Sequence, residues 1–193
     1  MLQLSLPLVL ASGSPRRKEI LTTMGLDYTI DVSEVDERCS GTPDQMVLTL
    51  SERKARAVAS RNANALVLAA DTLVYGGENV LGKPDSAENA FEMLRTLSGK
   101  WHEVYTGMTL LNTATGKCLR SAVCTRVHFV ELSDEEILTY IATGEPLDKA
   151  GAYGIQGVAG MFIDAIDGSY SNVVGLPMAQ LRQMIKEIEN AEN

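Results

Sequence analysis

Apolar residues in this chain fall into short continuous runs that are separated by longer amphipathic stretches. Short apolar runs are typical of strands, and a continuous run such as 65–70 indicates a strand covered on both faces. The pattern predicts strands at residues 7–11, 28–32, 65–70, 104–111, 119–130 and 161–166. The fourth and fifth of these flank Thr115 and Gly116, which predicts a hairpin.

Helix starts are indicated by capping boxes, in which a short polar residue precedes a Glu or Gln by three positions. Such boxes begin at Thr42, Asp85 and Ser133. Apolar residues then recur with helical spacing, and Gly99 follows the end of the second helix. Residues 177–188 predict a closing helix.

Strands and helices alternate in the first half of the chain, and an antiparallel pair follows later. This order predicts an α/β fold with a mixed sheet flanked by helices. No internal repeat, linker or low-complexity tract divides the sequence, so residues 1–193 are predicted to form a single domain.

Composition and charge narrow the class of protein. Hydrophobic residues make up 45% and charged residues 22% of the 193 residues, which is ordinary for a globular protein. The formal net charge of −8 argues against a partner bound through non-specific nucleic-acid contacts. A local basic pocket in such an acidic protein would instead select small polyanions.

The cysteines and the apolar segments bear on the compartment. Cys39, Cys118 and Cys124 form no CxxC pair and are odd in number, which favours free, at least partly buried thiols in a reducing compartment. The first residues lack the basic region of a signal peptide, and no run reaches membrane-spanning length. We therefore expect a cytoplasmic protein without a membrane partner.

The hexapeptide at residues 12–17 directly follows the first predicted strand. Ser14 can cap a helix, Pro15 suits its first turn, and Arg16 and Arg17 add permanently charged planar groups. Because a helix N-terminus also offers unpaired N–H groups, the segment predicts a polyanion cradle. The alternative is an ordinary capped helix whose arginines face solvent.

Carboxylates follow two of the predicted strands. Asp71 and Thr72 come after the 65–70 run, where ligand-binding and catalytic groups of α/β sheets collect. Asp71 could hold a divalent cation or take a proton from water, although carboxylates also cap turns. Asp36 and Glu37 follow residues 28–32 and are a further carboxylate pair that is a candidate for the same site. Lys54 lies on the helix that begins near Thr42, and such lysines are usually solvated.

Residues 77–83 match the first seven positions of a P-loop, but Pro84 stands where a Ser or Thr is needed for magnesium. The proline also disfavours helix at Lys83. We therefore reject a P-loop and predict a rigid turn that presents the Lys83 ammonium group.

A second unusual segment, residues 145–157, combines glycines with charged and amide side chains. Its glycines suit neither a helix nor a strand, which indicates that the backbone passes close to something. Gln156 could present a donor and an acceptor to a base edge. The alternative is a flexible surface loop. His102 and His128 lack a paired nucleophile, so we expect structural or surface roles for both.

Taken together, the motifs resemble those of the Maf proteins in kind and in order, over nearly the whole chain. The segments that carry the resemblance are Ser12–Arg17, Ala70–Thr72, Gly82–Pro84, Thr106–Gly107, Asp148–Gly157, Gly168–Tyr170 and Val174–Pro177. Maf proteins are nucleoside triphosphate pyrophosphatases whose fold is related to that of housecleaning enzymes that remove non-standard nucleotides. The resemblance implies an elongated mixed sheet flanked by helices, with two lobes around a central cleft.

The resemblance also implies hydrolysis of a nucleoside triphosphate to the monophosphate and pyrophosphate with Mg²⁺ or Mn²⁺, and a homodimer. The 148–157 segment is similar to that of the subgroup acting on dTTP and UTP. Asp71 resembles the family's proton acceptor, and with Glu37 it could hold the metal. Positions linked to substrate binding and choice are matched by Arg16, Thr72, Gln156, Ser14, Arg17, Lys54 and Lys83.

Two alternatives stay open at this point. One is a nucleotide-binding regulator of septum formation and cell division that acts through a protein partner without useful turnover. The other is a pyrophosphatase that prefers 7-methyl-GTP, as a related subgroup does.

Overall fold

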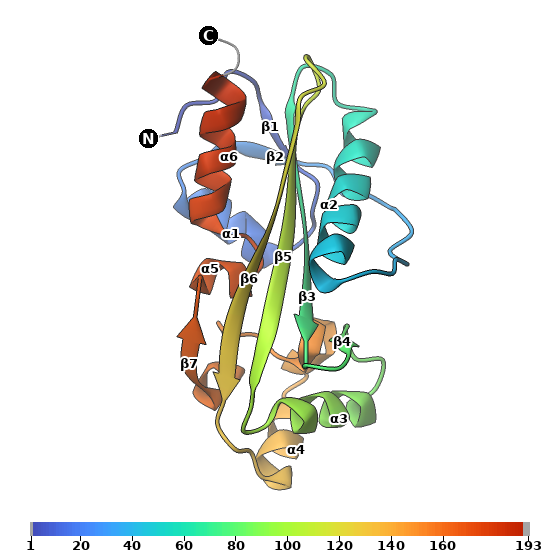
Figure 1. The fold of residues 1–193 in the computed structure, drawn as a ribbon, viewed down its shortest axis with the longest axis vertical. Helices are drawn as coiled ribbons and strands as arrows, with labels where there is room; N and C mark the ends of the chain where they lie inside the picture. Colours follow the sequence, from blue (N-terminus) through green and yellow to red (C-terminus); the bar gives the residue numbers. More distant parts are fainter. Residues whose placement is uncertain (1, 191–193) are drawn as a thin grey trace. The chain divides into compact units, whose positions relative to one another are not determined.

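The structure is a computed structural model, and it describes residues 2–190 (Figure 1). Its seven strands form one sheet in the order β2-β1-β3-β5-β6-β7, with β4 paired to β3. The strands are β1 Leu8–Leu10, β2 Tyr28–Ile30, β3 Leu66–Tyr75, β4 Val80–Leu81, β5 Trp101–Asn112, β6 Cys118–Phe129 and β7 Ile163–Asp167. Strand β1 is parallel to β2 and β3, whereas β4 and β7 are antiparallel to β3 and β6. The predicted mixed α/β class is confirmed.

The helices begin close to the predicted caps. They are α1 Pro15–Thr23, α2 Pro43–Ala59, α3 Ala87–Leu97, α4 Asp134–Ala142, α5 Tyr170–Val174 and α6 Met178–Asn190. Capping boxes at Thr42 and Ser133 are confirmed, whereas α3 is capped by Ser86, one residue later than predicted. Ser86 takes this role because its hydroxyl accepts the N–H of Asn89 at 3.0 Å.

Two parts of the chain differ from the prediction. Strand β3 does not end at Ala70 but continues to Tyr75, because the residues after Asp71 are mostly β-favouring. The predicted strand at 161–166 begins later, after a 3₁₀ helix. The segment at 145–157, for which a flexible surface loop was the alternative, contains two short 3₁₀ helices, and a third follows it. Helix α5 was not predicted. The 3₁₀ helices are η1 Glu145–Asp148, η2 Ala150–Ala152 and η3 Val158–Phe162.

The chain divides into two compact units. The first unit comprises the described residues 2–71, 106–123 and 175–190, and the second comprises residues 72–105 and 124–174. The assignment of residues 1–193 to a single domain stays a prediction.

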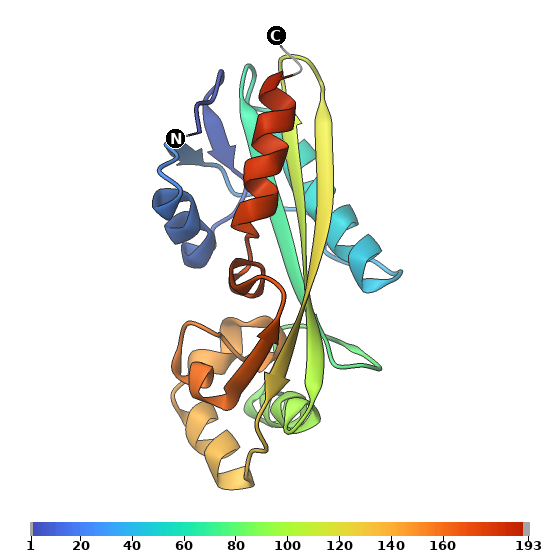
Figure 2. The same cartoon turned by 60° about the vertical axis from the view of Figure 1, so that its left-hand side comes forward.

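In the first unit, strands β1 and β3 carry apolar side chains on both faces. Val9 pairs in register with Val67, and both pack with Ala55 and Val58 of α2. The alternate residues, such as Leu10 and Leu68, face the other side and are buried there. Figure 2 shows α1 and α6 on one side of these strands and α2 on the other. The sheet of this unit is therefore covered on both faces, as the apolar runs predicted.

Gly107 of β5 lies against the backbone of α2. A Cβ atom at this position would overlap the carbonyl group of Val47 and crowd the amide of Leu48, which is 2.8 Å away. Neither of these backbone groups can swing aside as a side chain can. Glycine at position 107 therefore lets the backbone of α2 pack directly on β5. This close approach determines how far the side chains of α2 lie from the sheet.

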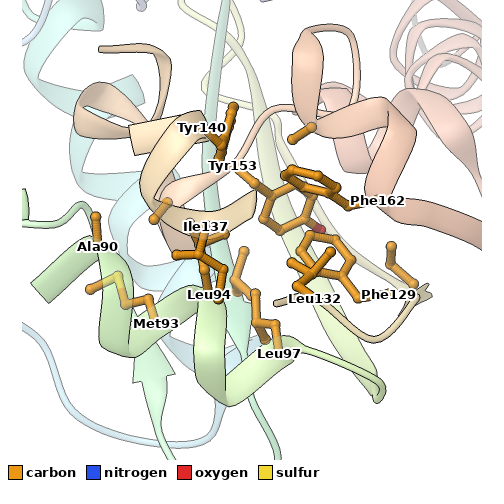
Figure 3. Packing of buried hydrophobic residues seen from close by; sticks show 14 of the residues in the cluster. Ala90, Met93, Leu94, Leu97, Phe129, Leu132, Ile137, Tyr140, Tyr153 and Phe162 are labelled. Atoms are coloured by element: carbon orange, nitrogen blue, oxygen red, sulfur yellow. The ribbon is translucent and has the colours of Figure 1, made fainter. Parts of the chain in front are cut away.

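The core of the second unit lies between helices α3 and α4 and the sheet (Figure 3). It contains an aromatic group in which Phe129 contacts Tyr153 with ring centroids 4.8 Å apart, and Tyr140 contacts Phe162 at 5.4 Å. The hydroxyl of Tyr153 hydrogen-bonds to Nε2 of His102 at 2.7 Å. This packing holds the segments that flank residues 145–157.

Among the residues that the structure describes, no helix is long and apolar enough to cross a lipid bilayer.

Candidate active site

The 12–17 hexapeptide forms the connection from β1 into α1. Pro15 is the first residue of α1, as predicted, but the Ser14 side chain makes no capping hydrogen bond. Instead, the Ser12 hydroxyl, which is buried, accepts the Ser14 N–H at 3.3 Å and an Arg17 guanidinium N–H at 3.1 Å. The Nε of Arg17 donates to the carbonyl of Gly175 at 2.9 Å. The guanidinium group of Arg17 is therefore held in a fixed orientation within the first unit.

Burial and nearby charges act on the pKa of Arg17. Burial lowers the pKa of its guanidinium group, and the neighbouring Arg16 lowers it further, whereas Asp71 and Glu37 act in the opposite direction. The net direction is downward because burial is the largest of these effects.

Lys54, Asp71 and Glu37 form an ion cluster in the same unit. The ammonium group of Lys54 lies 2.6 Å from Oδ1 of Asp71 and 2.8 Å from Oε1 of Glu37. The side chains of Lys54 and Asp71 are 13% and 14% exposed, whereas that of Glu37 is 65% exposed. One partly buried cation thus joins a partly buried carboxylate to a carboxylate that reaches solvent.

Periodicity explains why these residues meet. In β3, Asp71 alternates in phase with Val67 and Ala69, whose side chains pack against α2. In α2, Lys54 lies seven residues after Val47 and four before Val58, which places it on the buried stripe of the helix. The strand and the helix therefore bring the carboxylate and the ammonium group together. Lys54 was a candidate only through the family resemblance, and this stripe is the signal in the sequence that places it on the buried side of the helix.

Asp36 does not join the cluster, although it precedes Glu37. Its carboxylate pairs with Arg38, whose Nη2 lies 2.9 Å from Oδ2. Cys39, which sequence reasoning did not connect with the site, is electrostatically coupled to it. Burial raises the pKa of the Cys39 thiol, and the charges of Asp71 and Glu37 raise it further, so the thiol stays protonated there.

Among the described residues, no group of three or more His, Cys, Asp or Glu side chains is arranged to hold a metal ion alone. A pair of carboxylates is nevertheless the donor set that Mg²⁺ uses when substrate phosphates and water complete its coordination. Asp71 and Glu37 supply such a pair, drawn together by Lys54. The residues present therefore fit a metal that arrives with a phosphate ligand.

Thr72, Lys83 and Gln156 belong to the second unit. The carbonyl of Gly82, next to Lys83, accepts the N–H of Gly151 at 3.0 Å, so the Gly82–Pro84 motif is joined to the 145–157 region. Gly151 has a positive φ of 68°, and a Cβ there would lie 2.9 Å from Val74. The predicted close approach of the glycine-rich backbone is thereby confirmed, with Val74 as its neighbour. Gln156 is exposed.

The remaining candidates take structural or surface positions. His102 is buried in the aromatic group, and His128 lies at the surface with its Nδ1 2.6 Å from Asp164. The three cysteines are free, but Cys124 is exposed, contrary to the expectation of buried thiols. Two cavities of about 280 and 200 Å³ in the second unit are lined by none of the predicted site residues.

The first unit, an α/β arrangement, therefore holds an anchored arginine at a helix start and a lysine that joins two carboxylates. The model of the Maf-like protein family matches residues 7–188. The chain belongs to the Maf family.

Relatives of similar length support the assignment. The chain is 45% identical over 182 residues to a dTTP/UTP pyrophosphatase of Desulforamulus reducens, covering 93% of this chain and 95% of the relative. It is 47% identical over 184 residues to a dTTP/UTP pyrophosphatase of Bacillus cereus, covering 94% and 95%. A protein of the same name from Pelotomaculum thermopropionicum is 48% identical over 182 residues, covering 93% and 95%.

Proposed function

We propose that the protein hydrolyses dTTP and UTP to the nucleoside monophosphate and pyrophosphate. The observation that carries this proposal is the ion cluster, in which Lys54 joins Asp71 and Glu37 within the unit that anchors Arg17. The relatives named dTTP/UTP pyrophosphatase supply the substrate class. A house-cleaning role in the nucleotide pool follows from this activity.

The triphosphate requires neutralisation of its charge before water can attack the α-phosphorus. Arg17 is suited to this task because its guanidinium group is fixed by Ser12 and Gly175. Arg16 and Lys54 add positive charge in the same unit, and Lys83 is a further residue that we propose for substrate binding. Together these cations would reduce the repulsion between the triphosphate and an incoming water.

Asp71 is the group we assign to orient the attacking water and accept its proton. Its hydrogen bond from Lys54 keeps Oδ1 fixed. When phosphate oxygens compete for the Lys54 ammonium group, that hydrogen bond weakens and the carboxylate becomes a better proton acceptor. The same lysine would thus couple substrate binding to the activation of the base.

Asp71 and Glu37 would hold Mg²⁺ or Mn²⁺. When bound, such an ion polarises phosphoryl oxygens and neutralises developing charge. Glu37 suits this role because its carboxylate reaches solvent, from which a metal–nucleotide complex would arrive.

We propose that the side chain of Gln156 recognises the base of the nucleotide. Uracil and thymine present an acceptor–donor–acceptor edge, which a carboxamide can satisfy in part with its one acceptor and two donors. Ser14 and Thr72 are proposed to contribute further substrate contacts.

The first test is an assay of the purified protein with Mg²⁺ on the standard nucleoside triphosphates and 7-methyl-GTP, with nucleotides and pyrophosphate resolved by chromatography. We expect dTTP and UTP to give monophosphate and pyrophosphate, without orthophosphate. Preference for 7-methyl-GTP would contradict the substrate assignment. Tight binding without turnover in Mg²⁺ or Mn²⁺ would instead favour the regulator of cell division.

A homodimer and an elongated fold with two lobes around a central cleft, which the family resemblance implies, stay predictions, as does a cytoplasmic location. Size-exclusion chromatography with light scattering tests the homodimer. A mass of one chain, 20.9 kDa, would contradict it.

A further inference from the structure

Gln156 lies at the corner of a tight turn in the second unit. The N–H of Gly157 donates to the carbonyl of Gly154 at 3.0 Å, so Ile155 and Gln156 are the two central residues of the turn. The N–H of Gly160 then donates to the carbonyl of Gly157 at 3.0 Å. Because Gln156 is exposed, the direction of its carboxamide depends on how firmly this backbone is held.

The carboxylate of Glu145 holds the end of the turn. Its Oε2 accepts the backbone N–H of Val158 at 3.0 Å, and its Oε1 accepts the hydroxyl of Tyr140 at 2.9 Å. The same carboxylate lies directly against Gly157, since any Cβ atom at that position would overlap it. Both carboxylate oxygens are thus occupied by protein donors at the base of the turn.

The partners of Glu145 are themselves fixed. Tyr140 is only 2% exposed and packs edge-on against Phe162. Burial, followed by the hydrogen bond to Glu145, raises the pKa of the Tyr140 hydroxyl, so it remains a donor at physiological pH. On the backbone side, the ammonium group of Lys149 donates to the carbonyl of Glu145 at 2.7 Å.

From these contacts we propose that Glu145 is a positioning residue that sets the preference of the enzyme for uracil and thymine over cytosine. It does so by fixing the Gly154–Gly157 turn and hence the carboxamide of Gln156. This inference rests on the proposed function and on Gln156 as the reader of the base. Because its two oxygens bond Tyr140 and the backbone of Val158, Glu145 is placed to act through the turn.

Glu145→Gln is the main test, because glutamine has the same shape but only one oxygen acceptor. It can serve either Tyr140 or Val158 as an acceptor, and its amide then faces a second donor. We expect the ratio of kcat/KM for UTP to kcat/KM for CTP to fall about tenfold. Inhibition by inorganic tripolyphosphate, which has no base, should remain within about twofold of the parent protein.

Three further variants make the test independent of one substitution. Tyr140→Phe removes one of the two bonds and should lower the UTP-to-CTP ratio less than Glu145→Gln does. Gly157→Ala keeps the carboxylate but displaces it, and should lower the ratio as well. Glu135→Gln removes the same charge from an exposed position of α4 and should leave the ratio unchanged.

The outcomes distinguish a failure of the positioning role of Glu145 from a failure of the proposed function. If the parent protein prefers UTP to CTP and the folded Glu145, Tyr140 and Gly157 variants keep that preference, the positioning role is wrong. An equal loss on UTP, CTP and tripolyphosphate inhibition would also overturn it, because a general structural defect acts on all three. A parent protein that releases no pyrophosphate, or does not distinguish UTP from CTP, would overturn the proposed function and this inference with it.

Discussion

In the first unit, ion pairs hold Lys54, Asp71 and Glu37 together. In the second unit, hydrogen bonds and aromatic packing hold the 145–157 region. Lys54, Asp71 and Glu37 form a cluster that is buried at one side and open to solvent at the other. By contrast, the 145–157 region rests on Tyr140 and Tyr153, both nearly inaccessible to solvent. The charged groups suit a polyanion and a proton transfer, whereas the rigid aromatic support suits recognition by shape.

This difference teaches that the two tasks of the proposed reaction have different physical requirements. Phosphate binding needs charges that can exchange protein partners for substrate, and partly exposed ion pairs exchange at low cost. Base recognition needs a fixed direction for one carboxamide, which packed rings and doubly bonded side chains provide. Changes in the two regions should therefore produce different defects.

The largest effect is expected for Asp71→Asn. Asparagine keeps the shape but cannot accept a proton from water, so kcat should fall by about 10²–10⁴-fold. Circular dichroism should show an intact fold, and Asp164→Asn at the surface serves as the control. Full activity of the Asp71 variant would show that Asp71 is not the proton acceptor.

Lys54→Met should lower kcat/KM by about 10²–10³-fold, because it removes a preorganised positive charge and the hydrogen bond that orients the Asp71 carboxylate. The base preference should not change, which separates this defect from that of Glu145→Gln. Lys54→Arg should recover part of the activity. Lys186→Met, an exposed change on α6, is the matched control. Loss of base preference in the Lys54 variant would contradict the proposal that phosphate binding and base recognition depend on different regions.

The aromatic group of the second unit should be sensitive to acid. Burial lowers the pKa of His102 to about 4, and the charge of His128 contributes, against an ordinary value of 6.5. The unfolded chain therefore binds a proton first as the pH falls. Stability is fully present above pH 6.5 and decreases by about 3 kcal/mol as the pH approaches 4.

His102→Phe keeps a ring in this position but cannot bind a proton. Its stability should decrease less between pH 6.5 and 4.5 than that of the parent protein, as measured by urea unfolding at several pH values. His128→Gln should retain most of the decrease. The same slope in parent and His102 variant would assign the acid sensitivity to other groups.

The smallest effect is expected at Gly107. Gly107→Ala forces the backbone of α2 away from β5, and overpacking of this kind costs about 1–3 kcal/mol of stability. Thermal unfolding measures the loss. Since Lys54 moves with α2, turnover should also decrease, while the UTP-to-CTP ratio stays constant.

Local signals in the sequence predicted most of the elements. Capping at Thr42 and Ser133 and the turn at Gly116 depend on residues within a few positions, and these predictions are confirmed. Strand β3 was predicted too short because the charge of Asp71 interrupts an apolar run without ending the strand.

Long-range contacts set the features that the sequence did not reveal. The 3₁₀ segments around residue 150 depend on the bond from Val158 to Glu145, thirteen positions away. Within the site, the sequence identified Asp71, Glu37 and Lys54 as candidates, but their meeting at one ammonium group requires the packing of α2 on β3. The roles of Thr72, Lys83 and Gln156 stay predictions.

The hydrogen bond from Arg17 to the carbonyl of Gly175 spans 158 positions of the chain. During translation at roughly 5–20 residues per second, the ribosome makes Arg17 about 10–30 seconds before it makes Gly175. The side chain of Arg17, which we propose binds phosphate, can receive this anchor only after residue 175 has been made. A chain truncated before Gly175 lacks the hydrogen bond and should hold the guanidinium group less firmly.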